Sequence, residues 1–231
     1  MTDKTPMYSR YYQDHPADRN DLLSNAEVTF QMFAADRANI RALQRLRLDR
    51  DVTRILDVGC ATGAGIFQFL RLGFKPDRMT GVDISAERIA QARASLPNVE
   101  FRCESGASMS FGDGTFDLVF ESTMFVLLPS EDLARAIASE MIRVTRPGGY
   151  LMLVDWRYGK PGSDVYKAMS PKRIAALFDV GGATRVVARE RGALVPPLGR
   201  FLSRRVPSLY FAAQAMLPFA AGQITTVLQK T

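Results

Sequence analysis

Glycine residues cluster at one point of the chain, where Gly59, Gly63 and Gly65 follow a short apolar run. Glycine allows a positive φ angle and has no side chain to keep a ligand away from the backbone. The residues after the cluster have helical spacing, so free N–H groups and the positive end of a helix dipole would face the turn. This combination predicts a site for an anionic group, such as a carboxylate or a phosphate.

Asp83 is the next residue that could bind a ligand, at the end of the apolar run 79–82. It follows the glycine cluster by about twenty residues, a spacing at which a carboxylate can accept both hydrogen bonds of a ribose diol. The sequence therefore predicts that a nucleoside binds here.

The order of the glycines narrows the class of nucleoside ligand. The dinucleotide fingerprint is G-x-G-x-x-G, whereas residues 60–62 separate Gly59 from Gly63 in this chain. Asp57, two places before the first glycine, is badly placed for a pyrophosphate and well placed for an ammonium group. The pattern thus argues against a dinucleotide such as NAD.

Strands and helices are expected to alternate around these residues, because short apolar runs alternate with segments of helical spacing. The expected strands are 54–58, 79–82, 99–102, 116–120, 150–154, 184–190 and 224–229, and the expected helices include 86–95, 130–145 and one that starts at Ser170 and Pro171. Such alternation predicts a parallel, doubly wound sheet, in which ligands bind at the carboxyl ends of the strands.

Four segments in this order resemble the motifs of class I S-adenosylmethionine-dependent methyltransferases of the type 11/25 kind: 57–65, Asp83, 116–119 and 143–149. The resemblance covers residues 51–156. It implies an α/β, Rossmann-like fold with a mostly parallel sheet, helices on both faces and an antiparallel last strand. It also implies methyl transfer as the reaction and S-adenosyl-L-methionine as the cofactor.

The same resemblance implies roles for individual residues. Asp57 would approach the amino group of the cofactor, Asp83 would bind its ribose hydroxyls, and Ile84 would pack on its adenine. The glycine turn would hold the methionine part. The residues expected to bind the cofactor are Asp57, Gly59, Cys60, Ala61, Gly63, Asp83, Ile84, Ser105, Gly106 and Glu121.

Two positions depart from the pattern of the family. Ala61 stands where many relatives have a third glycine, a small change that the turn can accommodate. Ser105 stands where relatives usually have an aspartate for the adenine amino group. We expect Ser105 and the backbone of Gly106 to make this contact, with Glu104 as the second choice.

A general base would assist methyl transfer to an alcohol or a phenol, although alignment of the reactants is the main requirement. The weak candidates are His15, the only histidine, and Glu121 and Asp155, which end strands. For His15 the alternative to a role as base is a surface position in an N-terminal arm. For Glu121 the alternative to a role in the site is simple solvation.

The flanks of the core are expected to be helical. Residues 1–50 would form an N-terminal arm and cap helices, and the core, 51–231, would carry a helical insertion at 194–222. Three arginines at 200–205 lie beside apolar residues in this insertion. Such a segment can contact an anionic membrane peripherally or cover a pocket for a lipid-linked substrate. An extra helical layer that buries its apolar face is the favoured interpretation.

Composition limits the class of protein and its partners. A chain of 231 residues with 47% hydrophobic residues fits one globular domain, and its net charge of +6 favours anionic partners. Nucleic acid ranks below a small molecule, because the basic residues are dispersed without interleaved aromatic residues. Cys60 and Cys103 provide neither a disulfide framework nor zinc spacing, so we expect a cytoplasmic protein without a metal. Neither an export signal nor a membrane span is expected.

The leading hypothesis is methyl transfer to a small-molecule acceptor, with an oxygen atom preferred and a sugar or lipid-linked glycan considered. The alternatives are an RNA methyltransferase, a nucleotide-binding or NAD-dependent Rossmann protein that does not transfer methyl groups, and a catalytically silent relative.

Overall fold

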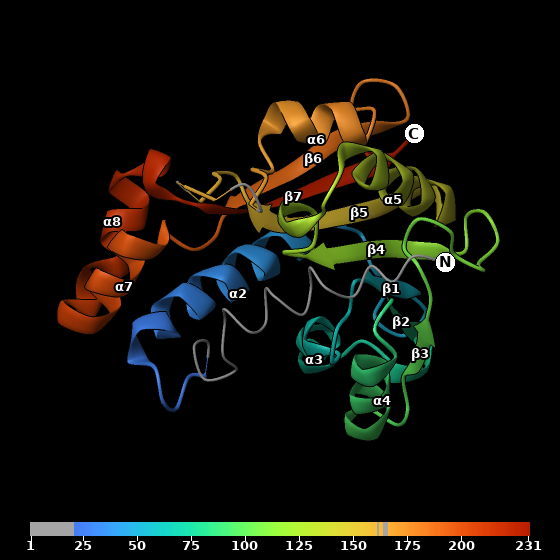
Figure 1. Ribbon diagram of the computed structural model, residues 1–231, viewed down its shortest axis with the longest axis horizontal. Helices are drawn as coiled ribbons and strands as arrows, with labels where there is room; N and C mark the ends of the chain where they lie inside the picture. Colours follow the sequence, from blue (N-terminus) through green and yellow to red (C-terminus); the bar gives the residue numbers. More distant parts are fainter. Residues whose placement is uncertain (1–20, 161, 164–165) are drawn as a thin grey trace.

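The chain is built on one twisted sheet, and Figure 1 shows its computed structural model, which describes residues 21–160, 162–163 and 166–231. Within these residues seven strands pair in the order β3-β2-β1-β4-β5-β7-β6. They are β1 (Ile55–Val58), β2 (Met79–Asp83), β3 (Glu100–Cys103), β4 (Phe116–Ser122), β5 (Thr145–Trp156), β6 (Thr184–Arg191) and β7 (Gln223–Lys230). The first five run parallel, and β7 is antiparallel to both β5 and β6. The mostly parallel sheet with an antiparallel last strand is therefore confirmed.

Helices cover both faces of the sheet (Figure 1). They include α3 (Ala64–Arg71) and α4 (Ala86–Ser95) on one face, and α5 (Glu131–Val144) and α6 (Pro171–Leu177) on the other. Neighbouring residues of a strand point to opposite faces, so each strand contributes to two cores. Val119 packs in the core under α5 and α6, whereas Phe120 packs in the core beside α3 and α4. This alternation decides on which side of the sheet each candidate site residue lies.

Serine residues begin three of the helices. The hydroxyl oxygens of Ser85, Ser130 and Ser170 each accept a hydrogen bond from the N–H three residues later, which satisfies one of the free donors at the helix start. Pro171 occupies the first position of α6, so the expected start of this helix is confirmed.

A helical cap stands at the carboxyl ends of the strands. It consists of η2 (Ala26–Val28), α2 (Thr29–Leu43), α7 (Pro196–Arg205), η5 (Pro207–Leu209), α8 (Tyr210–Met216) and η6 (Pro218–Ala220). Phe30 of α2 lies 5.8 Å from the ring of Tyr210 and 6.1 Å from that of Phe211, and the guanidinium of Arg37 lies 4.7 Å from the centre of the Phe211 ring. These contacts join segments far apart in the sequence. In the region before the core, where cap helices were expected, the structure has one α-helix, α2, after the short 3-10 turn η2.

The fifth strand begins earlier than the sequence predicted. We expected a strand at 150–154, but β5 begins at Thr145, which pairs with Phe116. An irregular register between Phe116 and Leu118, together with the positive φ angle of Gly148 (71°), lets the chain keep pairing through this stretch. The expectation was wrong because pairing across a bulge is not visible as apolar alternation.

Among the described residues no helix is long and apolar enough to cross a membrane. Two further 3-10 turns complete the connections, η3 (Pro76–Arg78) and η4 (Phe125–Leu127). The second of them follows β4 and lies at the edge of the sheet where the expected site residues meet.

Candidate active site

A pocket of about 300 Å³ opens at the carboxyl ends of β1, β4 and β5, between the sheet, α3 and α2. Ligands of doubly wound sheets bind at this edge. The pocket is lined by Met32, Ala35, Asp36, Asn39, Asp57, Gly59, Cys60, Ala61, Ala64, Gly65, Gln68, Phe120, Ser122, Val154 and Gln223. The structure thus brings together Asp57 and the residues of the glycine turn.

The turn after β1 needs glycine for two different reasons. Gly63 precedes α3 with a φ angle of 89°, which side chains rarely allow. At Gly65 the reason is space, because an added Cβ atom would lie 2.5 Å from Oδ2 of Asp57 and 2.7 Å from Cε1 of Phe120. Ala61, the departure from the family pattern, also has a positive φ angle, 47°. The turn therefore keeps its left-handed step at that position without a glycine, at a cost of about 1–2 kcal/mol.

Asp57 is a buried carboxyl group that lines the pocket against the first turn of α3. Burial, together with the negative charge of Asp83, raises the pKa of Asp57 to about 8. A buried carboxylate is costly unless a cation or hydrogen-bond donors accompany it. An ammonium group in the pocket would remove this cost. The expected cofactor carries such a group on its methionine part, so the carboxyl of Asp57 fits the role that the resemblance implies.

Asp83 is held at the end of β2 by two backbone groups. Its Oδ2 atom accepts a hydrogen bond from the N–H of Ala61 at 3.0 Å, and Oδ1 accepts one from the N–H of Ser85 at 2.8 Å. An ionised carboxylate has about four acceptor positions, so two remain for the hydroxyls of a diol. Ile84 is 50% exposed and offers an apolar surface next to them.

Cys60 lines the pocket without the properties of a nucleophile. Burial raises the pKa of its thiol, and the charges of Asp57 and Asp83 raise it further. The thiol therefore stays protonated at neutral pH, and the side chain acts as a small wall.

The loop after β3 carries the three candidates for the adenine contact. Gly106 lies against the end of β1, since an added Cβ atom would be 3.0 Å from Val58. Ser105 is exposed, and its hydroxyl accepts a hydrogen bond from the N–H of Ala107 at 3.3 Å. Both carboxylate oxygens of Glu104 bind Ser110, at 2.7 and 2.8 Å. These contacts leave Ser105 and Gly106 better placed for a ligand than Glu104.

Glu121 and Asp155 lie on the opposite face of the sheet from Asp57. Oε2 of Glu121 accepts a hydrogen bond from the N–H of Met124 at 3.1 Å, and Oδ2 of Asp155 accepts one from the N–H of Val126 at 2.9 Å. Both side chains are buried, so Glu121 is not solvated. Burial raises the pKa of Glu121 well above its ordinary value, and that of Asp155 to about 7. The two carboxyl groups hold the loop that follows β4, whose Met124 lies over Gly59.

A second pocket, of about 220 Å³, lies on that opposite face and is lined by Asp155. Its wall comes from β5, β6, β7 and the start of α6, and includes Arg157, Arg189 and Arg191. Asp155 is therefore separated by the sheet from the pocket that Asp57 lines. His15 lies outside the described residues. Within the described part of the chain, no group of three His, Cys, Asp or Glu side chains could hold a metal ion.

The sequence analysis missed a row of hydrogen-bonded polar side chains, of which Asn39 and Gln68 line the pocket. The hydroxyl of Thr225 donates to Oδ1 of Asn39 at 2.6 Å, and Nδ2 of Asn39 donates to Oε1 of Gln68 at 3.0 Å. The Nε2 atom of Gln68 is buried and, within the described residues, has no hydrogen-bond partner. Helical spacing gave a signal, because Gln68 lies four residues after Ala64 and shares its face. The contact with Asn39 depends on how α2 packs, which spacing does not reveal.

The chain is similar to several known methyltransferases. A family model described as "Methyltransferase domain" matches residues 55–149. The chain is 32% identical over 108 residues to 2-methyl-6-phytyl-1,4-hydroquinone methyltransferase of Synechocystis, covering 45% of this chain and 32% of that protein. It is 32% identical over 144 residues to fatty-acid O-methyltransferase of Mycolicibacterium smegmatis, covering 62% and 47%. The chain thus matches less than half of the length of either relative.

A solved structure with the same fold is the 1,6-didemethyltoxoflavin-N1-methyltransferase of Burkholderia thailandensis, determined with 1,6-didemethyltoxoflavin and S-adenosylhomocysteine bound. It superimposes with a TM-score of 0.62 at 14% identity, over 97% of this chain and 88% of that one. The expected resemblance is therefore confirmed: residues 55–149 form a methyltransferase domain with the class I fold.

Proposed function

We propose that the whole chain transfers a methyl group from S-adenosyl-L-methionine to an oxygen atom of a small, largely apolar acceptor. The observation that carries this proposal is one pocket in which the buried carboxyl of Asp57 and the glycine turn meet a wall from α2 and Gln68. The part of the pocket formed by Asp57 and the glycine turn has the groups that a charged cofactor needs. The part formed by α2 and Gln68 would take the acceptor.

The residues that would hold the cofactor follow from the geometry. Asp57 would neutralise its ammonium group, Asp83 would bind its ribose hydroxyls with the two acceptor positions that the backbone leaves free, and Ile84 would pack on its adenine. Ser105 and the backbone of Gly106 would contact the edge of the adenine. When bound, the cofactor supplies an activated methyl group on a sulfonium, so the protein has mainly to align the reactants and exclude water.

Gln68 would position the acceptor. Its Nε2 group is buried and, among the described residues, without a partner, and the pocket wall to which Gln68 belongs also includes Met32 and Phe120. A donor that lacks a partner favours a ligand atom with a lone pair, such as an oxygen, and the apolar neighbours favour a hydrocarbon body. The two relatives are named for a phytyl hydroquinone and for fatty acids. These names support a lipid-linked acceptor over a free sugar.

Glu121 and Asp155 would act by position rather than as the general base. Their carboxyl groups face away from the pocket and bind the backbone of the loop after β4. We propose that they fix Met124 over the glycine turn. The role of His15 as general base remains a prediction.

Calorimetric titration tests the cofactor part of the proposal. The protein should bind S-adenosylmethionine and S-adenosylhomocysteine, and not NADH. Asp83→Ala should weaken this binding by roughly 1.5–3 kcal/mol, about tenfold or more, because it removes hydrogen bonds to a charged group. Asp77→Ala, at an exposed carboxylate on η3, should leave the affinity unchanged. Binding of NADH instead would overturn the proposal in favour of a nucleotide-binding Rossmann protein.

Gln68→Leu tests the acceptor part. We expect the affinity for S-adenosylhomocysteine to stay within about twofold, while kcat/KM with a long-chain hydroxylated or carboxylated acceptor falls about tenfold, as for one lost hydrogen bond of 1–1.5 kcal/mol. Loss of S-adenosylhomocysteine binding in this variant would show that Gln68 serves the cofactor. Salt-sensitive methylation of RNA, without methylation of lipids, would favour the RNA methyltransferase.

A further inference from the structure

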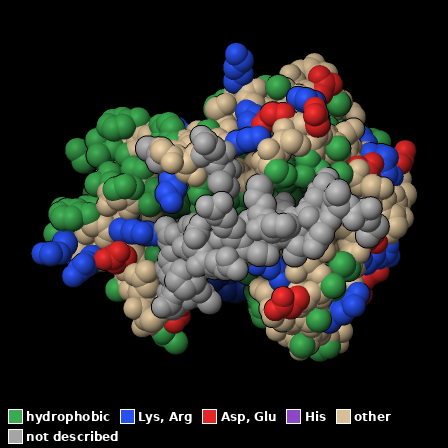
Figure 2. All heavy atoms as spheres, in the orientation of Figure 1, with side chains coloured by type: hydrophobic (Ala, Val, Ile, Leu, Met, Phe, Trp, Pro, Cys, Tyr) green, Lys and Arg blue, Asp and Glu red, His purple; other side chains and the backbone are tan. Residues whose placement is uncertain are grey.

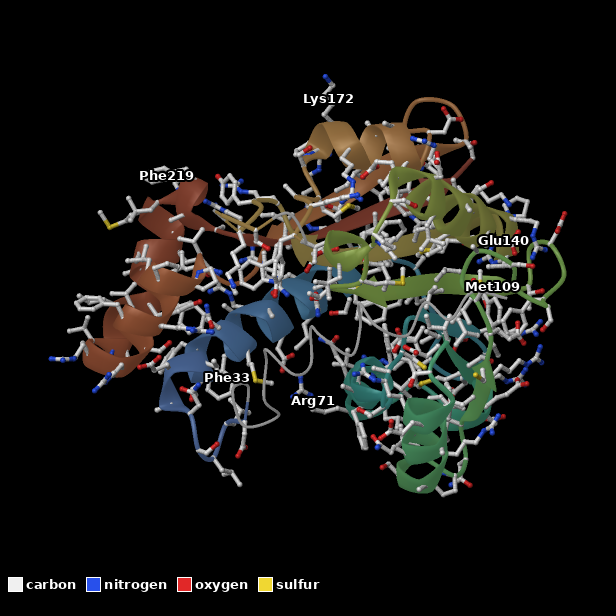
Figure 3. The ribbon with its side chains drawn as sticks, in the orientation of Figure 1. Phe33, Arg71, Met109, Glu140, Lys172 and Phe219 are labelled. Atoms are coloured by element: carbon white, nitrogen blue, oxygen red, sulfur yellow. The ribbon has the colours of Figure 1, made fainter. Side chains whose placement is uncertain are left out.

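The segment from α7 to η6 exposes large apolar side chains to solvent. Phe201, Leu209, Met216 and Phe219 are 59%, 52%, 79% and 66% exposed. We call these four side chains the cap face. Figure 2 shows hydrophobic side chains gathered over α7 and α8, and Phe219 lies at the outer edge of the cap in Figure 3. Scattered exposed apolar residues are normal, but a concentration in one segment marks an interaction site.

The same part of the chain is basic and lacks acids. The 25 residues from Pro196 to Ala220 contain three basic residues and no Asp or Glu, so they carry +3 of the net charge of +6. Arg200, Arg204 and Arg205 lie on α7, beside the cap face. Figure 2 shows Lys and Arg side chains projecting at the outer end of the cap. Glu27 of η2 lies 3.3 Å from Arg204, whose side chain is still 63% exposed.

The cap face is held by a packed interior rather than by a loose segment. Leu202, Tyr210 and Ala220 are buried beneath it in one apolar cluster. The hydroxyl oxygen of Tyr210 accepts a hydrogen bond from the N–H of Leu194 at 3.1 Å. The neighbours of these buried residues, Phe201, Leu209 and Phe219, are therefore presented outward by a formed structure.

The cap also borders the pocket. Met32 of α2 lines the pocket, while Phe30, two residues earlier, packs against Tyr210 of α8. Gln223, which follows η6 closely, lines the pocket as well. The helix α2 and the short link from η6 to Gln223 therefore join the cap to the pocket wall.

We propose that the cap face docks on an anionic phospholipid membrane, with the four apolar side chains inserted between the headgroups and the arginines of α7 bound to phosphates. Apolar contact combined with basic residues is what peripheral attachment requires, because each basic residue near the surface adds to the affinity for anionic lipid. The proposal rests on the proposed function for its consequence, which is that a lipid-borne acceptor passes from the membrane to the pocket.

Vesicle co-sedimentation tests the docking without any acceptor or cofactor. The full chain should bind vesicles of phosphatidylcholine with 30% phosphatidylglycerol, and bind vesicles of pure phosphatidylcholine at least tenfold more weakly. The double variant Arg204→Gln with Arg205→Gln should bind the anionic vesicles about 25-fold more weakly, about fivefold for each arginine. The double variant Met216→Ser with Phe219→Ser should bind the anionic vesicles at least about tenfold more weakly than the wild type does. Salt should weaken the binding of the wild type.

Matched variants on other surfaces serve as controls. Phe67→Ser, at a residue of α3 that is 51% exposed, and Arg135→Gln, at a 60% exposed side chain of α5, should bind vesicles as the wild type does. All variants should retain their binding of S-adenosylhomocysteine, so that failure of the cofactor site is seen separately. Equal binding to both kinds of vesicle, or loss in the control variants as large as in the cap variants, would overturn the proposal. A concentration-dependent dimer that Met216→Ser dissociates would do the same, since a second copy would then cover the cap face.

Discussion

The protonation state of Asp57 should control how tightly the proposed cofactor binds. Its pKa of about 8 means that most of the carboxyl is protonated at neutral pH in the free protein, because burial and Asp83 both disfavour its charge. The cofactor would bind the ionised form, since only that form attracts an ammonium group. Binding must therefore release a proton from this residue at pH values below about 8.

This release predicts a pH dependence of binding. Between pH 6 and pH 8 the affinity for S-adenosylhomocysteine should rise, by up to about tenfold per pH unit, because each unit raises the ionised fraction of Asp57 by that factor. Calorimetry at three pH values, in two buffers of different ionisation enthalpy, measures both the affinity and the proton. Asp57→Asn should bind more weakly and lose the dependence. An affinity in the wild type that is flat over this range would contradict the role of Asp57.

At the scale of elements, Lys230 ties the end of β7 to the end of α5. Its Nζ atom donates to the carbonyl oxygens of Ile142 and Thr145, both at 2.8 Å. These carbonyls are at the carboxyl end of a helix, where the dipole also favours a positive charge. One side chain therefore satisfies carbonyl groups of α5 and β5 from a position 85 to 88 residues later in the sequence.

Lys230→Met should consequently lower the free energy of unfolding by about 1–2 kcal/mol, since buried carbonyl groups lose a charged donor. Urea unfolding at pH 7 measures this loss. Lys172→Met is the control, because Lys172 projects away from the molecule on α6 (Figure 3) and its loss should change the free energy by less than about 0.5 kcal/mol. Equal stability of the two variants would show that the contacts of Lys230 contribute nothing.

How far the sequence predicts the elements depends on the range of the interactions that form them. The strand, turn and helix around Gly59 could be predicted because turn chemistry and helix capping act over a few residues, as at Ser170. The side of the sheet on which Glu121 lies could not be predicted, because β4 is apolar on both faces. Val119 and Phe120 are both apolar although they point to opposite sides, so the sequence shows no alternation that would assign a side to Glu121. The meeting of Gln68 with Asn39 depends on the packing of α2 against the sheet, which is a long-range contact.

For the molecule as a whole, three buried carboxyl groups make stability depend on pH. The pKa values of Asp57, Glu121 and Asp155 are all raised, chiefly by burial. Between the unfolded pKa of about 4 and the folded values, the native state holds more protons than the unfolded chain. Stability from these groups is therefore present at low pH and is lost as the pH rises toward 8.

Thermal unfolding of the protein without cofactor should show this loss. We expect a higher Tm at pH 6 than at pH 8, with a slope of the unfolding free energy that approaches about 1.4 kcal/mol per pH unit for each group still protonated in the native state. Glu121→Gln should flatten the slope, because the amide stays neutral and can still occupy the site. A Tm that rises between pH 6 and pH 8 would mean that these carboxyl groups are ionised in the native protein.

The position of β7 has a consequence for how the protein is made. This strand lies between β5 and β6, yet it is synthesised after both of them. On the ribosome, β6 thus has no partner in the sheet until β7 emerges, and its exposed edge is a template for pairing with other chains. Residues 55–149 can begin to assemble earlier, so the growing chain carries a partly formed candidate site before its sheet is complete. A chaperone that shields strand edges would be needed most in that interval.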